Sequence, residues 1–213
     1  SLAQESHHPP TGRQDSWKQH QKMALESPFN DLTWQTLGPK FAGGRIESID
    51  APRGDLGTIY VGVGAGGIWK TTNGGLTWKP IFNQESTFAI GDLTIAPNDP
   101  STIWVGTGEC HVGRMSYSGT GVFKSEDAGP TWTNMGLHES FHIGQIAIDP
   151  QDSQTVYVAA MGSRRSGGQR GIFKTTDGGK SFRHVLKAQT QVSFVDLVID
   201  PSQSGRLYAS AWD

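Results

Sequence analysis

The sequence predicts an all-β fold of repeated four-stranded units, a β-propeller. Glycine supplies 28 of the 213 residues, about twice its usual share, seven tryptophans accompany it, and long helix-forming stretches are missing. The deciding observation is an internal repeat, in which Trp78, Trp132 and Phe182 close successive units 54 and 50 positions apart. Four short strands in a unit of about 40–50 residues are typical of a propeller blade.

Each unit carries the same four apolar segments, separated by turn residues such as those of Pro97-Asn-Asp-Pro100. We expect first strands at 45–49, 93–96, 145–148 and 196–199, second strands at 58–61, 102–105, 155–158 and 206–209, third strands at 68–71, 122–125 and 172–175, and fourth strands at 77–81, 131–135 and 181–186. The fourth unit holds only two strands, and 33–37 resembles a fourth strand without its partners. We therefore expect an incomplete N-terminal part of a larger propeller, about three and a half blades, with an exposed end near 195–213.

Residues 1–32 differ from the repeats, so we divide the chain into an N-terminal extension, 1–32, and a propeller segment, 33–213. A short helix is expected at 17–26, ending before Ser27-Pro28. The start, Ser1-Leu-Ala-Gln, resembles the remnant of a signal-peptide cleavage site, which would place the protein outside the cell or in the periplasm. The alternative, an arbitrary start of the chain, is left open. His7-His8 is too short for a metal-binding tract.

Charge and cysteine content exclude several classes of protein. The 18 basic and 20 acidic residues give a net charge of −2 without a basic run, which argues against nucleic-acid binding. No stretch of about 18 apolar residues is present that could span a membrane. The single cysteine, Cys110, excludes an internal disulfide framework, and no metal-ligand spacing is found. We expect neither metal nor cofactor.

The hairpins between third and fourth strands carry the most specific pattern. They read Thr71-Thr-Asn-Gly-Gly-Leu-Thr-Trp78, Ser125-Glu-Asp-Ala-Gly-Pro-Thr-Trp132 and Thr175-Thr-Asp-Gly-Gly-Lys-Ser-Phe182. They resemble the Asp-box, or BNR, repeat, in which an Asx side chain bonds the turn backbone and glycine supplies a positive φ. Asn73, Ala128 and Phe182 depart from the commoner residues. A structural hairpin is favoured over a ligand site, because a structural role tolerates such variants.

Segments flanking the repeats extend this resemblance: Leu32-Thr-Trp34, Leu37-Gly-Pro39, Gly43-Gly-Arg45, Val105-Gly-Thr-Gly-Glu109 and Gly119-Thr-Gly-Val-Phe-Lys-Ser125. With them, residues 17–213 resemble secreted bacterial BNR-repeat proteins of the sortilin-like and xyloglucanase-like propeller superfamily. The resemblance implies the fold but not one activity, since such propellers include glycoside hydrolases, peptide-binding receptors and photosystem assembly factors.

Chemistry is expected on the propeller face where the loops between second and third strands meet those joining successive blades. These loops and the adjoining first strands hold the candidate carboxylates Asp92, Glu109 and Glu139, two of which would serve as acid and base or nucleophile in glycoside hydrolysis. Candidate substrate-binding residues on the same face are Arg45, His111, Arg114, Tyr117, His142, Arg164 and Arg165. We align the starts of the first strands as Arg45, Asp92, Gln145 and Asp196. Structural roles for all of these groups stay open.

Two functions remain. The first is a secreted, glycan-directed glycoside hydrolase acting on a polysaccharide. The second is a non-catalytic scaffold of sortilin-like type that binds a peptide or protein. A hydrolase requires paired carboxylates beside aromatics such as Trp104, Tyr117 or Phe141, whereas a receptor of this type requires an apolar tunnel. Gly62-Val-Gly-Ala-Gly-Gly67 matches a dinucleotide-binding pattern, but a strand rather than a helix is expected to follow it.

Overall fold

The computed structural model describes residues 10–32, 44–111, 116–163, 167–187, 192–203 and 205–212. They belong to two compact units, Ser1–Gly43 and Gly44–Asp213. The expected strand at 33–37, His7 and His8 lie outside the described residues.

The first unit contains one described helix, α1 (Pro10–Leu25). The helix begins at Pro10, seven residues before the predicted start at Trp17. Proline is well suited to the first turn of a helix, because the N–H that it lacks would have no acceptor there. Along its exposed surface, Trp17 stacks on His20 with ring centroids 5.2 Å apart, and Lys22 pairs with Glu26 at 3.8 Å. Within the described residues, no helix is long and apolar enough to cross a bilayer.

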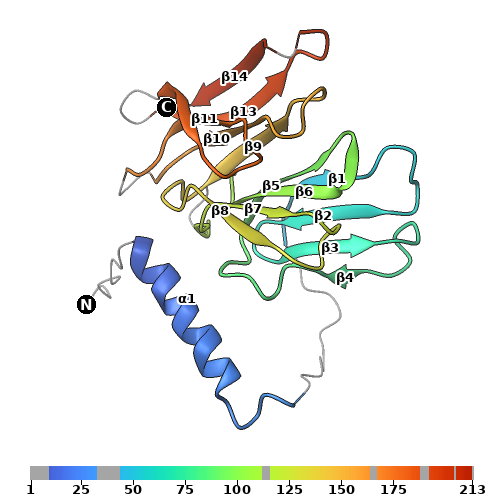
Figure 1. The fold of residues 1–213 in the computed structure, drawn as a ribbon, viewed down its shortest axis with the longest axis vertical. Helices are drawn as coiled ribbons and strands as arrows, with labels where there is room; N and C mark the ends of the chain where they lie inside the picture. Colours follow the sequence, from blue (N-terminus) through green and yellow to red (C-terminus); the bar gives the residue numbers. More distant parts are fainter. Residues whose placement is uncertain are drawn as a thin grey trace. The chain divides into compact units, whose positions relative to one another are not determined.

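The second unit is a row of antiparallel sheets, each formed by strands in chain order (Figure 1). Blade 1 consists of β1 (Ile46–Asp50), β2 (Ile59–Val63), β3 (Gly67–Thr71) and β4 (Lys79–Pro80). Blade 2 consists of β5 (Ile90–Ala96), β6 (Asp99–Thr107), β7 (Val122–Ser125) and β8 (Thr133–Gly136). Blade 3 consists of β9 (Ile143–Ile148), β10 (Val156–Ala160), β11 (Gly171–Thr175) and β12 (Arg183–Lys187). The pair β13 (Ser193–Ile199) and β14 (Leu207–Trp212) follows. The predicted all-β partial propeller is confirmed.

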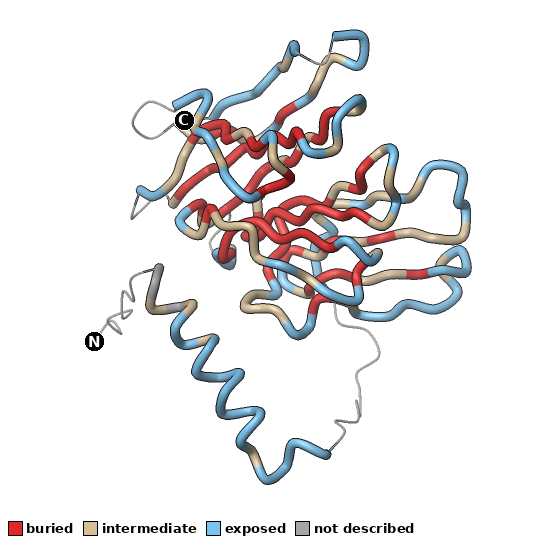
Figure 2. Tube along the Cα trace, viewed as in Figure 1, coloured by how far each residue is buried: buried red, intermediate tan, exposed pale blue. Residues whose placement is uncertain are grey.

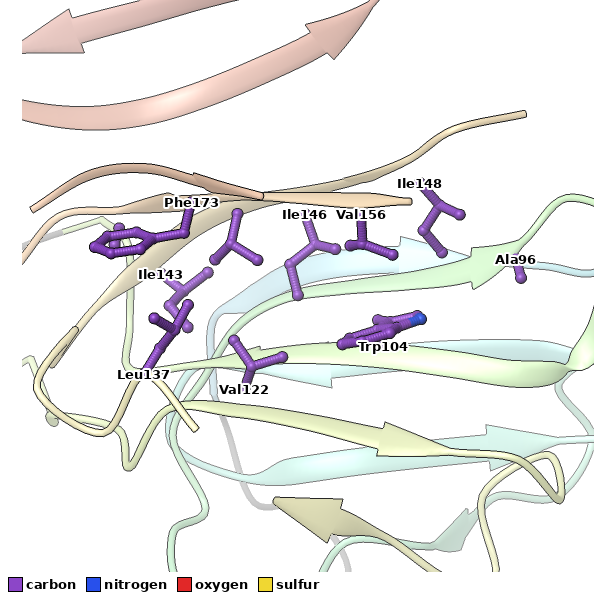
Figure 3. Packing of buried hydrophobic residues seen from close by; sticks show 11 residues of the cluster. Ala96, Trp104, Val122, Leu137, Ile143, Ile146, Ile148, Val156 and Phe173 are labelled. Carbon is purple, nitrogen blue, oxygen red and sulfur yellow. The ribbon is translucent and has the colours of Figure 1, made fainter. Parts of the chain in front are cut away.

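Apolar side chains fill the spaces between neighbouring sheets. Figure 3 shows this packing between blades 2 and 3, where Trp104 and Val122 face Ile146 and Phe173. A second cluster, around Tyr60 and other residues of blades 1 and 2, fills the preceding interface. Side chains alternate between the two faces of a strand, and a sheet with a neighbouring sheet on each side buries both faces.

The first strands of the sheets, β1, β5, β9 and β13, lie side by side in that order. Asp92 on β5 links three blades. Its carboxylate accepts hydrogen bonds from the Ser48 hydroxyl of β1 at 2.9 Å, and from the Ile146 amide at 2.7 Å and the Gln145 side chain at 3.1 Å, both of β9. Burial raises the pKa of Asp92, and the hydrogen bonds from Ile146 and Ser48 partly oppose the rise. Asp92 is thus a buried residue whose hydrogen bonds join three blades.

The three repeated hairpins share one pattern of internal hydrogen bonds, except that in the first the Asn73 side-chain amide donates to the Thr77 hydroxyl. In the second, the Ser125 hydroxyl donates to Asp127 at 2.7 Å and accepts from the Gly129 amide at 2.9 Å. The Asp127 carboxylate also accepts from the amide and hydroxyl of Thr131 at 3.0 and 2.6 Å. The Trp132 indole N–H reaches the Ile81 carbonyl oxygen of blade 1 at 2.8 Å. These contacts give the second hairpin a structural role within its blade and between blades.

The two ends of the row are more exposed than its centre (Figure 2). Ile46 and Ile49 of β1 are exposed at one end, and Val198, Tyr208 and Trp212 of β13 and β14 at the other. Apolar faces of this kind are expected of blades whose neighbours in a ring are other sheets.

Candidate functional site

A cluster of five polar side chains lies where blade 1 meets the loop after β6. Arg45 precedes β1, Glu47 lies within β1, and Glu109, Cys110 and His111 follow β6. We call these five residues the Arg45 cluster. The two glutamates are its buried base, with side chains 0 % and 3 % exposed for Glu47 and Glu109, whereas Arg45 and His111 are 54 % and 74 % exposed.

A β-bulge places Glu47 in this cluster. The pairing of β1 with β2 shifts between Ile46 and Ser48, so Glu47 is the extra residue. Equivalent shifts occur in β5 at Gly91, in β9 at Gly144 and in β13 between Phe194 and Asp196. The predicted alignment of Arg45 with Asp92 is therefore wrong, because the bulges align Ser48 with Asp92.

The other bulge residues of the inner blades are glycines for steric reasons. A Cβ at Gly91 would lie 2.1 Å from the carbonyl oxygen of Ile143, and one at Gly144 would lie 2.3 Å from that of Val195. At the same position blade 1 carries the long carboxylate side chain of Glu47. Among the bulge residues Glu47, Gly91 and Gly144, only Glu47 therefore carries a charged side chain.

Arg45 joins the two carboxylates. Its Nε donates to Glu47 Oε1 at 3.1 Å, and its terminal nitrogen Nη2 donates to Glu109 Oε2. The other oxygen of Glu47, Oε2, accepts from the Cys110 thiol at 3.2 Å and contacts His111 Nδ1. Burial opposes the charge on Glu47, but the hydrogen bonds from His111, Cys110 and Arg45 outweigh it and hold its pKa below the usual value. Glu47 is thus ionised at neutral pH.

Cys110 and His111 do not form an activated nucleophile. The thiol sulfur lies 3.3 Å from His111 Nδ1. Burial, together with the hydrogen bond to Glu47, raises the pKa of Cys110 to about 12. Because the thiolate is the nucleophilic form, a thiol that remains protonated at neutral pH is unsuited to covalent catalysis.

An exposed aromatic pair joins the loop after β6, which carries Tyr117, to the loop between β4 and β5, which carries Phe88. Phe88 and Tyr117, 51 % and 46 % exposed, meet edge to face with centroids 5.2 Å apart. The Glu109 amide donates to the Tyr117 carbonyl oxygen at 3.1 Å, and the Gly67 amide donates to that of Phe88 at 2.8 Å. These backbone bonds fix the aromatic pair to the loop of the Arg45 cluster and to the start of β3.

The remaining predicted site residues are placed differently. Asp92 is buried between blades, as described above, and Glu139 is exposed, with its backbone bonded to Gln169 at 3.1 and 2.9 Å. His142 is buried, with Nδ1 2.9 Å from the Glu109 carbonyl oxygen, so it supports the loop of the cluster. Trp104 is fully buried in the core. Three predicted arginines lie outside the described residues: Arg114, Arg164 and Arg165.

The structure therefore brings together Arg45, Glu109, His111 and Tyr117 from the predicted set. Sequence reasoning missed Glu47 and Phe88. The sequence comparison matched Gly44 with Gly91. Matching Glu47 with Gly91 instead would have identified Glu47 as the one charged residue at this position. No motif identifies Phe88, because its role depends on the position of Tyr117.

Comparison with known proteins places the fold. No protein-family model matches the chain. A xyloglucanase of Hypocrea jecorina is 23 % identical over 189 residues, covering 81 % of this chain and 21 % of the enzyme. An oligoxyloglucan-reducing end-specific xyloglucanase of Emericella nidulans is 32 % identical over 111 residues, covering 50 % of this chain and 13 % of the enzyme.

Solved structures agree with these relatives. A GH74 enzyme from Niastella koreensis superposes with a TM-score of 0.59 at 24 % identity, covering 76 % of this chain and 24 % of the enzyme. The extracellular domain of a two-component system protein, BT3049 of B. thetaiotaomicron, superposes with a TM-score of 0.56 at 14 % identity, covering 82 % of this chain and 23 % of that domain. The likeness establishes the fold. The chain spans about a fifth of the length of the xyloglucanase from Hypocrea jecorina (21 %).

Proposed function

We propose that this chain forms part of a secreted or periplasmic propeller that binds a polysaccharide of the xyloglucan class. The observation that carries the proposal is the exposed pair Phe88–Tyr117, in which Tyr117 lies on the same loop as Glu109, the partner of the half-exposed Arg45. The xyloglucanase relatives supply the substrate class, and the extracellular domain among the structural neighbours supports the location.

The chemistry of this surface suits a sugar chain. Aromatic faces pack against the C–H faces of pyranose rings, and charged hydrogen-bonding groups recognise the hydroxyls around them. Arg45 and His111 provide such groups and are open to solvent. A peptide-binding tunnel would be lined by apolar side chains, so the polar, open surface favours the glycan over the receptor-type ligand.

Hydrolysis of that glycan is a second activity that one observation favours. Burial raises the pKa of Glu85, which lies on the same loop as Phe88. Glu47 has its pKa shifted in the opposite direction. Glycoside hydrolysis requires two carboxyl groups of this kind, one whose pKa is raised and one that stays ionised. In this scheme Glu85 is the acid, and the carboxylate comes from the pair that Arg45 bridges, Glu47 and Glu109.

Binding is tested by affinity electrophoresis of the full-length protein through gels containing xyloglucan or other plant and bacterial polysaccharides. We expect Phe88→Ala and Tyr117→Ala each to weaken binding about tenfold, equivalent to about 1.4 kcal/mol. Leu76→Ala removes an exposed apolar side chain near the opposite end of β3 and should bind as the wild type does. Unchanged binding of both aromatic variants, or no retardation by any polysaccharide, would refute the proposal.

Hydrolysis is tested separately by release of reducing ends. Glu85→Gln should abolish release while retaining retardation in the gel, and Glu109→Gln should also abolish release. Glu126→Gln, which removes an exposed carboxylate at the second hairpin, should leave the rate unchanged. Full activity of Glu85→Gln would exclude Glu85 as the acid, and binding without any release by the wild type would leave a glycan-binding scaffold.

A further inference from the structure

We propose that Glu47, Cys110 and His111 together bind one divalent transition-metal ion of the zinc class. Their carboxylate oxygen, thiol sulfur and imidazole nitrogen all lie within 4.8 Å of one another. The three donor types are those that zinc accepts in proteins. The site goes beyond the proposed glycan binding, which does not require a metal.

The spacing of the donors fits a tetrahedral ion. With bonds of about 2.3 Å to sulfur and about 2.0 Å to nitrogen and oxygen, the donors of such an ion stand about 3.3–3.6 Å apart. Cys110 Sγ lies 3.2 Å from Glu47 Oε2 and 3.3 Å from His111 Nδ1. The closer contact between His111 and Glu47 can widen, because the exposed imidazole of His111 is free to rotate outward.

The surroundings of Glu47 orient it for this role. Arg45 Nε holds Oε1, which leaves Oε2 turned toward Cys110 and His111. Carboxylate ligands in metal sites are commonly fixed by such a hydrogen bond to their second oxygen. The same arginine is shared with Glu109, so the cluster carries two carboxylates against one guanidinium. This excess of negative charge favours a divalent cation.

Binding exchanges a proton for the metal. The Cys110 thiol gives its proton to solvent as the metal–sulfur bond forms, because a divalent ion stabilises the thiolate. Glu47 is already ionised, and His111 binds through the lone pair of Nδ1. The exposure of His111 leaves the fourth position to water. Three protein ligands with one open position are typical of sites that exchange their fourth ligand.

The test uses the full-length protein, stripped with a chelator and titrated with Co²⁺ as a spectroscopic probe. We expect a sulfur-to-cobalt charge-transfer absorption that Cys110→Ser abolishes. His111→Ala and Glu47→Gln should each weaken Co²⁺ binding by about tenfold or more. The controls His20→Ala and Glu126→Gln remove an exposed imidazole of α1 and an exposed carboxylate of the second hairpin, and both should titrate as the wild type does.

Two outcomes would overturn the proposal: no sulfur-to-cobalt absorption in the wild type, or an absorption that persists in Cys110→Ser. Because Glu47 is buried, Glu47→Gln can lose stability by itself, whereas the exposed His111 can be truncated without disturbing the core. Zn²⁺ should also raise the melting temperature of the wild type and not that of Cys110→Ser. The cobalt readout uses no polysaccharide, so failure of the metal site and failure of the proposed function are distinguishable.

Discussion

Ala128 stores backbone strain that a single substitution should release. It has a φ of 61° in the second hairpin, where the first and third hairpins have Gly74 and Gly178 at 67° and 68°. Three hydrogen bonds hold the residue there: its amide donates to the Ser101 carbonyl oxygen at 2.8 Å, and its carbonyl oxygen accepts from Tyr60 at 3.2 Å and Lys70 at 2.9 Å. Blade 1 and strand β6 of the alanine's own blade therefore hold Ala128 in a left-handed conformation.

The expected gain from Ala128→Gly follows from two opposing terms. A left-handed conformation costs a residue with a Cβ about 1–2 kcal/mol. Glycine recovers this cost but makes the unfolded chain more flexible, which takes back about 0.4–1 kcal/mol. The net stabilisation is roughly 0.8 kcal/mol, and for a chain of this size it should raise the melting temperature by about 2–3 °C.

The matched reverse change is Gly74→Ala. A Cβ at Gly74 meets no atom within 4 Å, so its cost is conformational alone. It should lower the free energy of unfolding by about the amount that Ala128→Gly adds. Both variants are compared with the wild type by calorimetry and urea denaturation. An unchanged or lowered melting temperature for Ala128→Gly, or an unaffected Gly74→Ala, would refute the strain.

Three further changes probe the blade framework. Trp132→Phe loses the indole hydrogen bond to a blade 1 carbonyl 2.8 Å away and should cost about 1 kcal/mol in urea denaturation; a zero cost would show that the bond is not stabilising. Hydrogen bonds from Thr131 hold the pKa of Asp127 at about 2, below its unfolded value, so its stabilisation is present above pH about 4 and is lost as the pH falls toward 2. Asp127→Asn should therefore show a flatter fall in melting temperature over that range, and an equal slope would contradict the assignment. Gly91→Ala places a Cβ 2.1 Å from the Ile143 carbonyl oxygen and should abolish soluble, cooperatively melting protein; near-normal melting would mean that the two strands can separate.

The strands could be predicted because the same strand pattern repeats in each unit of the sequence. Segments such as Thr102-Ile-Trp-Val-Gly recur with the same spacing and turn residues, so each unit supports the assignment of the others. The third strands show this best, since the expected 122–125 and 172–175 match β7 (Val122–Ser125) and β11 (Gly171–Thr175) within one residue. The fourth strand of blade 1, expected at 77–81, is confined to Lys79–Pro80, where proline offers no N–H to extend the ladder.

The candidate site could be predicted only in part, because its members come from different blades. Glu109, His111 and Tyr117 lie on one long loop that its length and position already marked as functional. Glu47 is 62 residues before Glu109, and its position depends on a bulge that no residue preference in β1 signals. In addition, matching Gly44 with Gly91 shifted the alignment of blade 1 on blade 2 by three positions, so Arg45 rather than Ser48 was matched with Asp92.

The bulge explains how a repeated framework acquires one chemically distinct position. In blades 2 and 3 the adjoining first strand approaches so closely that only glycine fits, and Gly91 and Gly144 meet this requirement. Blade 1 has room at the equivalent position for the Glu47 side chain, which reaches across to Arg45 and to Cys110 at the end of blade 2. A charge at this position contributes little to the hydrophobic interfaces, which the neighbouring apolar clusters already stabilise. Its partners instead form an interdependent polar network, in which loss of one member leaves a buried carboxylate without compensation. The chemistry of the site therefore rests on a side chain that the repeat itself does not require.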